Sequence, residues 1–212
     1  MIKNILKKIV PKSFLSFYHW ILAHLAALIY RYPSNKMIVI GVTGTAGKST
    51  IVNMIAKVFE KAGYKVGLTT TFNFKIGNKE WINKEKMTML GRFSLQKLLR
   101  KMVKKGCQYA VIETTSQGIK QFRHLGINYD IAVFTGIFKE HLESHGGFSK
   151  YCQAKEKLFL HLSKSKKKTI NNKLIDKVSV VNLDDKERER FLKYSVDKKY
   201  GYKIHRGSLF RK

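Results

Sequence analysis

The chain has 212 residues, enough for one sizeable domain with an additional segment, and a hydrophobic content of 44% excludes global disorder. The formal net charge of +28 is large, but its lysines are spread over every segment and the usual nucleic-acid motifs are absent. We therefore interpret the charge as a solvated lysine-rich surface and do not expect nucleic acid as the main partner. Cys107 and Cys152 are far apart and form no metal-ligand pair or disulfide framework, which favours the reducing cytoplasm.

Residues 1–36 form a basic and apolar segment ahead of the rest of the chain. Lysines precede the apolar stretch of residues 14–30, which is at the short edge of what spans a bilayer. We expect a helix and leave its environment open. It either lies on the inner membrane face with Trp20, Tyr18 and Tyr30 near the headgroups, packs on the protein or a partner, or spans the membrane. The charge order fits a signal peptide, but no convincing cleavage site follows.

From Met37 onward, apolar β-branched runs alternate with segments of helical apolar spacing. The expected strands cover residues 37–43, 66–71, 109–113, 131–135 and 178–182, with a hairpin over residues 72–79. The expected helices cover residues 48–62, a segment that is capped by Ser94 and ended by Gly106, and residues 148–162. This order predicts an α/β fold, namely a doubly wound, mostly parallel sheet with helices on both faces, over residues 37–212.

A glycine-rich loop follows the first of these strands and enters a helix. It reads Gly44-Thr45-Ala46-Gly47-Lys48-Ser49-Thr50. The glycines permit close approach of a ligand, and backbone N–H groups at the helix N-terminus then face phosphate oxygens. Lys48 adds a positive charge near the β- and γ-phosphates, and Ser49 or Thr50 offers a hydroxyl to Mg²⁺. The loop predicts binding of ATP and Mg²⁺.

Other polar groups follow neighbouring strands. Glu113 ends the strand over residues 109–113, and the loop of residues 136–147 follows the strand over residues 131–135. Ligands of such sheets bind at the carboxyl ends of the strands. We therefore expect Glu113, this loop and the phosphate loop to converge.

The spacing G-x-x-G-K-S-T resembles the ATP site of the Mur ligases, which join amino acids to UDP-linked muramoyl peptides in building bacterial cell wall. Further blocks resemble the family in the same order. Residues 113–117 resemble E-x-S-S-H, residues 123–130 resemble R-x-x-G-x-x-F-D, residues 132–146 resemble A-V-F-T-N-L-T-R-D-H-L-D-Y-H-G, residues 151–159 resemble Y-x-x-A-K-x-x-L-F, and residues 181–185 resemble V-N-A-D-D. The resemblance covers the central domain and is strongest to the subgroup that adds the third residue of the peptide, the MurE-type enzymes.

The resemblance implies an ATP-dependent amide-bond ligase of peptidoglycan precursor synthesis in the cytoplasm. Such an enzyme phosphorylates a carboxylate to an acyl phosphate, which an amine then attacks. Ser49 and Glu113 would ligate the first magnesium ion, and by resemblance Glu113, His141 and a carbamylated Lys155 would hold a second. The implied catalytic residues are Lys48, His141 and Lys155, and the implied substrate contacts are Thr88, Ser116 and Arg123. The implied partners are a nucleotide-linked or muramoyl peptide and an amino acid.

The chain departs from the family in several places. Gly136, Glu140 and Gln117 replace the family's Asn, Asp and His, and only Thr88 remains of its T-T-P stretch. A basic apolar helix replaces the N-terminal domain, and the sequence stops before the position at which the central domain of the family ends. Two functions follow as expectations. One is a ligase core that is incomplete at its C-terminal end, and the other is a non-catalytic, membrane-associated ATP-binding module that needs a partner chain.

Overall fold

The computed structural model describes residues 12–85, 87–138 and 146–203, and the side chains from residue 16 onward. An 8-stranded sheet has the order β10-β9-β6-β1-β5-β2-β3-β4, and β7 and β8 form a separate small hairpin. The strands are β1 Ile38–Thr43, β2 Val66–Thr69, β3 Asn73–Ile76, β4 Lys79–Ile82, β5 Tyr109–Glu113, β6 Ile131–Phe134, β7 Thr169–Ile170, β8 Lys173–Leu174, β9 Val178–Asn182 and β10 Lys198–Tyr202. The helices are α2 Lys12–Ile29, a 3-10 turn Pro33–Lys36, α3 Lys48–Lys61, α4 Arg92–Lys104, α5 Ser116–Lys120, α7 Phe148–Lys164 and α8 Arg188–Leu192.

The sheet is mostly parallel. All pairings from β10 to β2 are parallel, and only β3 and β4 run antiparallel, as a hairpin at one edge. The central strand β1 lies between β5 and β6 and is almost wholly buried. Its continuous apolar run fits this position, because a parallel strand that is covered on both faces has no solvent side.

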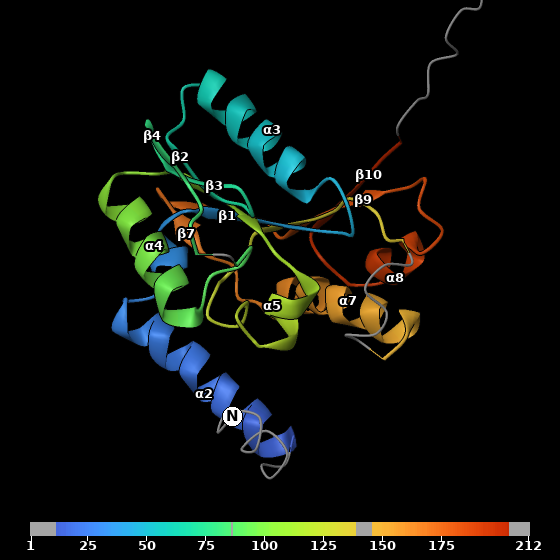
Figure 1. The fold of residues 1–212 in the computed structure, drawn as a ribbon. Coiled ribbons are helices and arrows are strands. Elements are labelled where there is room, and N and C mark those ends of the chain that lie inside the picture. Colours follow the sequence, from blue (N-terminus) through green and yellow to red (C-terminus); the bar gives the residue numbers. More distant parts are fainter. Residues whose placement is uncertain (1–11, 86, 139–145, 204–212) are drawn as a thin grey trace, which may run out of the picture.

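Helices cover both faces of the sheet, as Figure 1 shows. On one face α3 packs on Ile40 and Val42 of β1 through Val52 and Ala56. On the other face a larger core joins Val39 of β1 to α4, α5, α7 and α8. Successive residues of β1 thus point into different cores, as the alternation of a strand requires. The predicted doubly wound α/β fold is confirmed.

Helix α2 packs on α4 through small residues. Ala23, Ala26 and Ala27 are buried, and a Cβ atom added to Gly126 would lie 2.7 Å from the carbonyl oxygen of Ala23. The close approach therefore needs glycine at position 126. In the part of the chain that the structure describes, no helix is both long and apolar enough to cross a membrane.

Several expected boundaries were wrong. Ser94 does not cap α4, because the helix begins at Arg92 and Gly91 accepts the first-turn hydrogen bond from the Leu95 amide at 2.8 Å. The strand expected over residues 66–71 ends at Thr69, and the strand expected over 131–135 ends at Phe134. The helices α5 and α8, the strand β10 and the β7–β8 hairpin were not predicted from the sequence.

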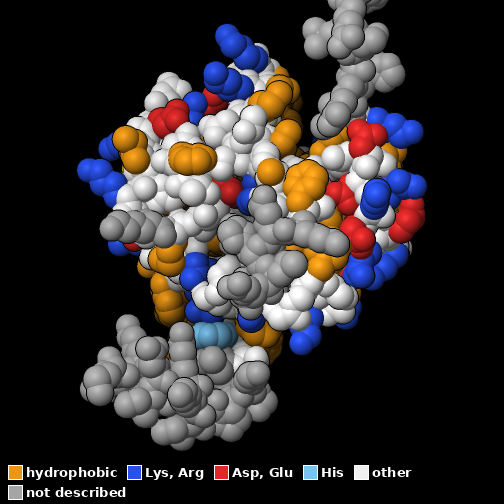
Figure 2. Space-filling view, turned by 45° about the vertical axis from the view of Figure 1, so that its right-hand side comes forward, with side chains coloured by type: hydrophobic (Ala, Val, Ile, Leu, Met, Phe, Trp, Pro, Cys, Tyr) orange, Lys and Arg blue, Asp and Glu red, His pale blue; other side chains and the backbone are white. Residues whose placement is uncertain are grey.

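Lysine and arginine side chains are distributed over the visible face in Figure 2 rather than gathered into one patch. This distribution agrees with the reading of the net charge of +28 as a solvated surface.

Candidate active site

The phosphate loop connects β1 to α3 and is tied to the neighbouring loop that follows β6. The Thr45 amide donates to the Gly136 carbonyl oxygen at 2.8 Å, and the Thr135 hydroxyl donates to the Ala46 carbonyl oxygen at 2.8 Å. Gly47 precedes α3 with φ of 77°, a left-handed conformation that favours glycine. The loop is thus held open in front of the N-terminus of α3, as phosphate binding requires.

The side chains of Lys48 and Ser49, in the first turn of α3, contact the phosphate loop and Glu113 respectively. The Lys48 ammonium donates to the Thr45 carbonyl oxygen at 2.7 Å, so it lies across the loop. The Ser49 hydroxyl donates to Glu113 Oε2 at 2.6 Å. Thr50 is exposed and lines a different hollow, beside Asn53. Of the two hydroxyls that the sequence left open, Ser49 is therefore the one that faces the carboxylate.

Glu113 ends β5 and is 2% exposed. Besides Ser49, it accepts hydrogen bonds from the Thr71 amide at 3.0 Å and from the Thr71 hydroxyl at 3.2 Å. These contacts fix the carboxylate at the strand edge, beside the phosphate loop. Thr71, which follows β2, carries no motif in the sequence and was missed.

Lys155 reaches the same site from α7, which covers the face of the sheet opposite to α3. Its ammonium donates to the Gly44 carbonyl oxygen at 2.6 Å and lies 4.4 Å from the centre of the Tyr151 ring. Burial and, as a smaller effect, the nearby charge of Lys48 together lower the pKa of Lys155 to about 7. A buried lysine with a substantial neutral fraction is a nucleophile, and this is the form that carbamylation requires.

Tyr151 links the two sides of the site. Its hydroxyl lies 3.1 Å from the Thr45 hydroxyl, which also accepts a hydrogen bond from the Phe138 amide at 3.0 Å. The phosphate loop, the loop after β6 and α7 therefore meet at Thr45.

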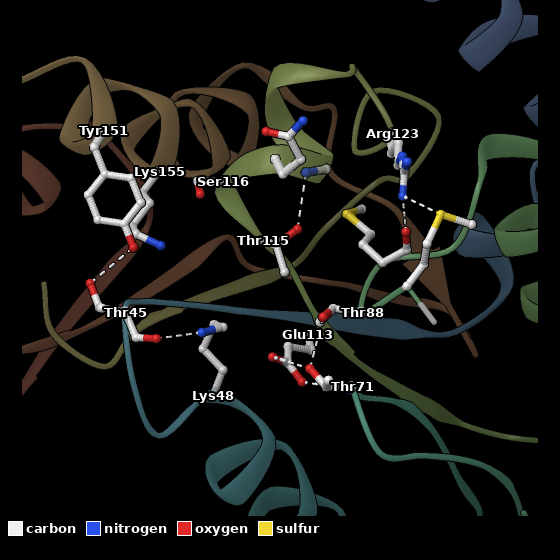
Figure 3. A pocket seen from close by; sticks show the side chains of 14 residues that line it. Thr45, Lys48, Thr71, Thr88, Glu113, Thr115, Ser116, Arg123, Tyr151 and Lys155 are labelled. Carbon is white, nitrogen blue, oxygen red and sulfur yellow. Dashed lines mark hydrogen bonds between the residues drawn. The ribbon is translucent and has the colours of Figure 1, made fainter. Parts of the chain in front are cut away.

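These groups line one cavity of about 530 Å³. In Figure 3, Tyr151, Lys155 and Ser116 lie along one wall, and Lys48, Glu113, Thr71 and Thr88 lie across from them. Glu113 and the phosphate loop converge here, as expected.

The expected substrate residues line the same cavity, away from the phosphate loop. Thr88 Oγ1 lies 2.9 Å from Thr71 Oγ1, and Ser116 is the first residue of α5. Arg123 donates to the Met89 carbonyl oxygen and to the Gln121 side chain, both of which are neutral acceptors. Within the described residues, no acidic side chain forms an ion pair with Arg123, so its charge is available to an anionic group in the cavity.

Arg92 of α4 carries no motif and was not predicted as a site residue. Its guanidinium donates to the Gln121 carbonyl oxygen, and its pKa is lowered by burial and by the neighbouring charge of Arg123. The charges of both arginines add to burial in lowering the pKa of His19 of α2. Arg92 therefore adds positive charge behind Arg123, which lines this end of the cavity.

The loop after β6 is held by the last residue of β9 and by a residue just beyond that strand. Asp185 Oδ2 accepts a hydrogen bond from the Ile137 amide at 2.6 Å, and Asn182 donates to the Thr135 carbonyl oxygen at 3.0 Å. The block V-N-L-D-D thus positions the loop that contacts Thr45.

His141 lies outside the described residues, so its expected role stays a prediction. Among the residues that the structure does describe, no group of three or more His, Cys, Asp or Glu side chains could hold a metal ion. The expected magnesium ligands are of another kind, namely the Ser49 hydroxyl and the Glu113 carboxylate, with Lys155 nearby.

The model of the protein family described as "Mur ligase middle domain" matches residues 42–209 of the chain. The chain belongs to the Mur ligase family. A Mur ligase from Roseiflexus sp. (strain RS-1), the UDP-N-acetylmuramyl-tripeptide synthetase, is 39% identical over 173 residues, which cover 81% of this chain and 34% of that protein. The UDP-N-acetylmuramoyl-L-alanyl-D-glutamate--2,6-diaminopimelate ligase of Chlamydia felis is 38% identical over 152 residues, which cover 72% and 31%.

Solved structures share the fold. A UDP-N-acetylmuramoyl-L-alanyl-D-glutamate--2,6-diaminopimelate ligase matches with a TM-score of 0.64 and 29% identity, over 82% of this chain and 33% of that one. Folylpolyglutamate synthase of Mycobacterium tuberculosis, complexed with ADP and AMPPCP, shares the fold with a TM-score of 0.61 at 14% identity, over 87% and 46%. The chain spans about one third of the length of the curated Mur ligases that it matches.

Proposed function

We propose that this chain is the nucleotide-binding core of an ATP-dependent amide-bond ligase of Mur type. One observation carries the proposal. Thr45 and Lys48 of the phosphate loop, the Glu113 carboxylate that accepts from Ser49, and the buried Lys155 line a single cavity together with Thr88, Ser116 and Arg123. Nucleotide-binding and acceptor-binding groups are thus within reach of each other, as transfer of a phosphoryl group to a carboxylate requires.

The residues present fit a magnesium nucleotide. Backbone N–H groups at the N-terminus of α3 and the Lys48 ammonium would bind the phosphate oxygens. The Ser49 hydroxyl and Glu113 carboxylate already lie 2.6 Å apart, and hydroxyl and carboxylate oxygens are the ligands that Mg²⁺ prefers. The bound ion would neutralise charge on the transferred phosphate. Lys155, once carbamylated, would add an oxygen ligand, and His141 completes the proposed set.

The acceptor would be an anionic peptide whose terminal carboxylate points at the γ-phosphate. Arg123 would bind an anionic group of this peptide, and Thr88 and Ser116 would orient it with their hydroxyls. The carboxylate oxygen attacks the γ-phosphorus and ADP leaves, which produces an acyl phosphate. The amine of the incoming amino acid then attacks the acyl carbon, phosphate leaves and the amide forms. By analogy with the named relatives, we propose a UDP-linked muramoyl peptide as acceptor and peptidoglycan precursor synthesis in the cytoplasm as the setting.

Binding of Mg-ATP to the Lys48→Ala variant tests the proposal. Calorimetric titration should show an affinity at least about tenfold below that of the parent chain, because a charge-assisted contact to phosphate is lost. Lys57→Ala, which removes an exposed lysine from the same helix, should bind as the parent does. Equal affinities of the parent chain and Lys48→Ala would refute the proposal.

The second candidate is a non-catalytic ATP-binding module that is membrane-associated and needs a partner chain. It is favoured by α2, which follows a lysine-rich stretch and leaves large apolar side chains exposed. In either case we propose residues 37–212 as the nucleotide-binding domain and residues 1–36 as a basic and apolar helical segment that precedes it. Amide formation by the isolated chain, assayed with the muramoyl peptide and candidate amino acids, would reject the second candidate.

A further inference from the structure

The outer surface of α2 is apolar, which reverses the usual pattern of a surface helix. A helix that packs on a protein normally turns its large apolar residues inward. Here the buried side consists of alanines, and large side chains on the other side are 40% to 58% exposed. We call these residues the apolar face of α2, and they are Phe17, Trp20, Ile21, Leu25, Leu28 and Ile29.

A basic cluster borders this face. Lys97, Lys101 and Lys104 follow one stripe of α4, together with Arg100, and Arg31 joins them just beyond the end of α2. These five residues line a hollow of about 490 Å³ with Ile29 and Tyr30. Within the described parts of the chain, no carboxylate forms an ion pair with any of the five side chains.

We propose that α2 and the basic cluster dock this protein on the surface of an anionic phospholipid membrane, with α2 lying in the plane of the interface. The apolar face would enter the headgroup region, where Trp20 suits the boundary between water and lipid. The basic cluster would bind lipid phosphates. The alanine side of α2 stays packed on α4, so the helix docks without leaving the protein.

The positive charge around the apolar face of α2 favours an anionic membrane over a second copy of the chain as its partner. Two copies that share their apolar faces would bring two basic clusters together, and each chain carries a net charge of +28. An anionic bilayer matches both properties of the surface, because it accepts apolar side chains and attracts lysine and arginine. Four further lysines, Lys3, Lys7, Lys8 and Lys12, precede the apolar face in the sequence and add to the positive charge.

Fluorescence of the intact face tests the proposal first. The chain has 2 tryptophans, so Trp81→Phe on the β3–β4 hairpin leaves Trp20 as the only one. Its emission should shift to the blue when vesicles of phosphatidylglycerol and phosphatidylcholine are added, and should not shift with phosphatidylcholine alone. An unchanged emission with both kinds of vesicle, together with no co-sedimentation, would overturn the proposal.

Charge and apolar variants then locate the surface. The triple variant Lys97→Glu, Lys101→Glu, Lys104→Glu should bind the anionic vesicles at least about tenfold more weakly. Its control is Lys57→Glu, Lys61→Glu, Lys79→Glu, which changes the net charge equally at another surface and should bind nearly as the parent does. The pair Leu28→Glu, Ile29→Glu should abolish binding, whereas Val58→Glu, Ile82→Glu, at side chains 68% and 73% exposed, should not. Equal losses in variants and controls would show unspecific attraction and reject the proposal.

Two more measurements separate the alternatives. A dimer in vesicle-free solution that dissociates in Leu28→Glu, Ile29→Glu would assign the face to a second copy and overturn membrane docking. The Lys48→Ala variant should bind vesicles as the parent does, since docking needs no nucleotide. Membrane docking and the proposed ligase function can therefore fail independently.

Discussion

At the scale of single residues, the contacts of Glu113 indicate that its carboxylate is a metal ligand rather than a purely structural group. Its two oxygens accept hydrogen bonds from Ser49 and from Thr71, and among the described residues no positive side chain donates to it. A buried carboxylate whose hydrogen-bond donors are all neutral is costly. A bound Mg²⁺ would supply the missing charge, which is why we place the ion between Glu113 and Ser49.

The variant Glu113→Gln tests this placement. The glutamine oxygen can keep the bonds from Ser49 and the Thr71 amide, and its amino group can donate to the Thr71 hydroxyl, so the fold should persist. ATP affinity in the presence of magnesium should fall at least about tenfold, because the charged ligand is lost. Titration calorimetry with and without magnesium measures this. Glu189→Gln, at an exposed carboxylate of α8, is the control, and an unchanged magnesium effect in Glu113→Gln would contradict the placement.

Lys155 gives a second prediction at the same scale. Its amine is buried against Tyr151 and the Gly44 carbonyl, where a carbamate would be protected from water. Carbon-13 NMR with labelled bicarbonate should show a protected carbamate signal in the parent chain. Lys155→Ala should lose the signal, and Lys157→Ala, two residues along α7 and exposed, should keep it. A signal that survives Lys155→Ala belongs to another lysine and would count against the assignment.

At the scale of elements, the buried parts were predictable and the edges were not. The strands β1, β5 and β9 and the helices α3 and α7 carry clear apolar patterns, because both sheet faces are covered. The edge strand β10 reads Lys-Lys-Tyr-Gly-Tyr and is mostly exposed, so no pattern marks it. The same contrast holds in the site. Motifs in the sequence identify Lys48, Glu113 and Lys155 as site residues. Thr71 and Arg92 belong to no motif, and only the fold brings them to the site.

The packing of α2 on α4 leads to a prediction for Gly126. A methyl group there would lie 2.7 Å from the Ala23 carbonyl oxygen and 2.8 Å from the Gln96 amide. Gly126→Ala should therefore push α2 outward and lower the free energy of unfolding by about 1–3 kcal/mol. Thermal unfolding and hydrogen exchange in α2 measure this. Gly91→Ala, whose methyl meets no atom within 4 Å, should change stability by less than about 1 kcal/mol. Equal effects of both changes would mean that α2 does not depend on this close approach.

At the scale of the whole molecule, the buried His124 and the half-buried His161 connect pH to stability. The His124 ring lies 5.3 Å from that of His161, whose Nε2 donates to the Ile127 carbonyl oxygen at 2.7 Å. Burial lowers the pKa of both rings, and burial together with the charges of His161 and Lys157 lowers that of His124 to about 3. Lys177 and His24 act in the same direction on His161. The pair joins α7 to the segment between α5 and β6, so its protonation loosens the core beneath the site.

The sign of the pH dependence follows from these pKa shifts. Below pH 6.5 the unfolded His124 binds a proton that the folded ring refuses until about pH 3, so acid favours the unfolded chain. The free energy of unfolding should fall by about 3 kcal/mol from this group between pH 7.5 and 4.5. Urea denaturation at pH 7.5, 6 and 4.5 would measure the slope, and His124→Phe, which keeps an aromatic ring against His161, should flatten it by that amount. At pH 7.5 the group contributes no slope, so that point is the internal reference. Parallel profiles for the parent chain and His124→Phe would show that the acid sensitivity arises elsewhere.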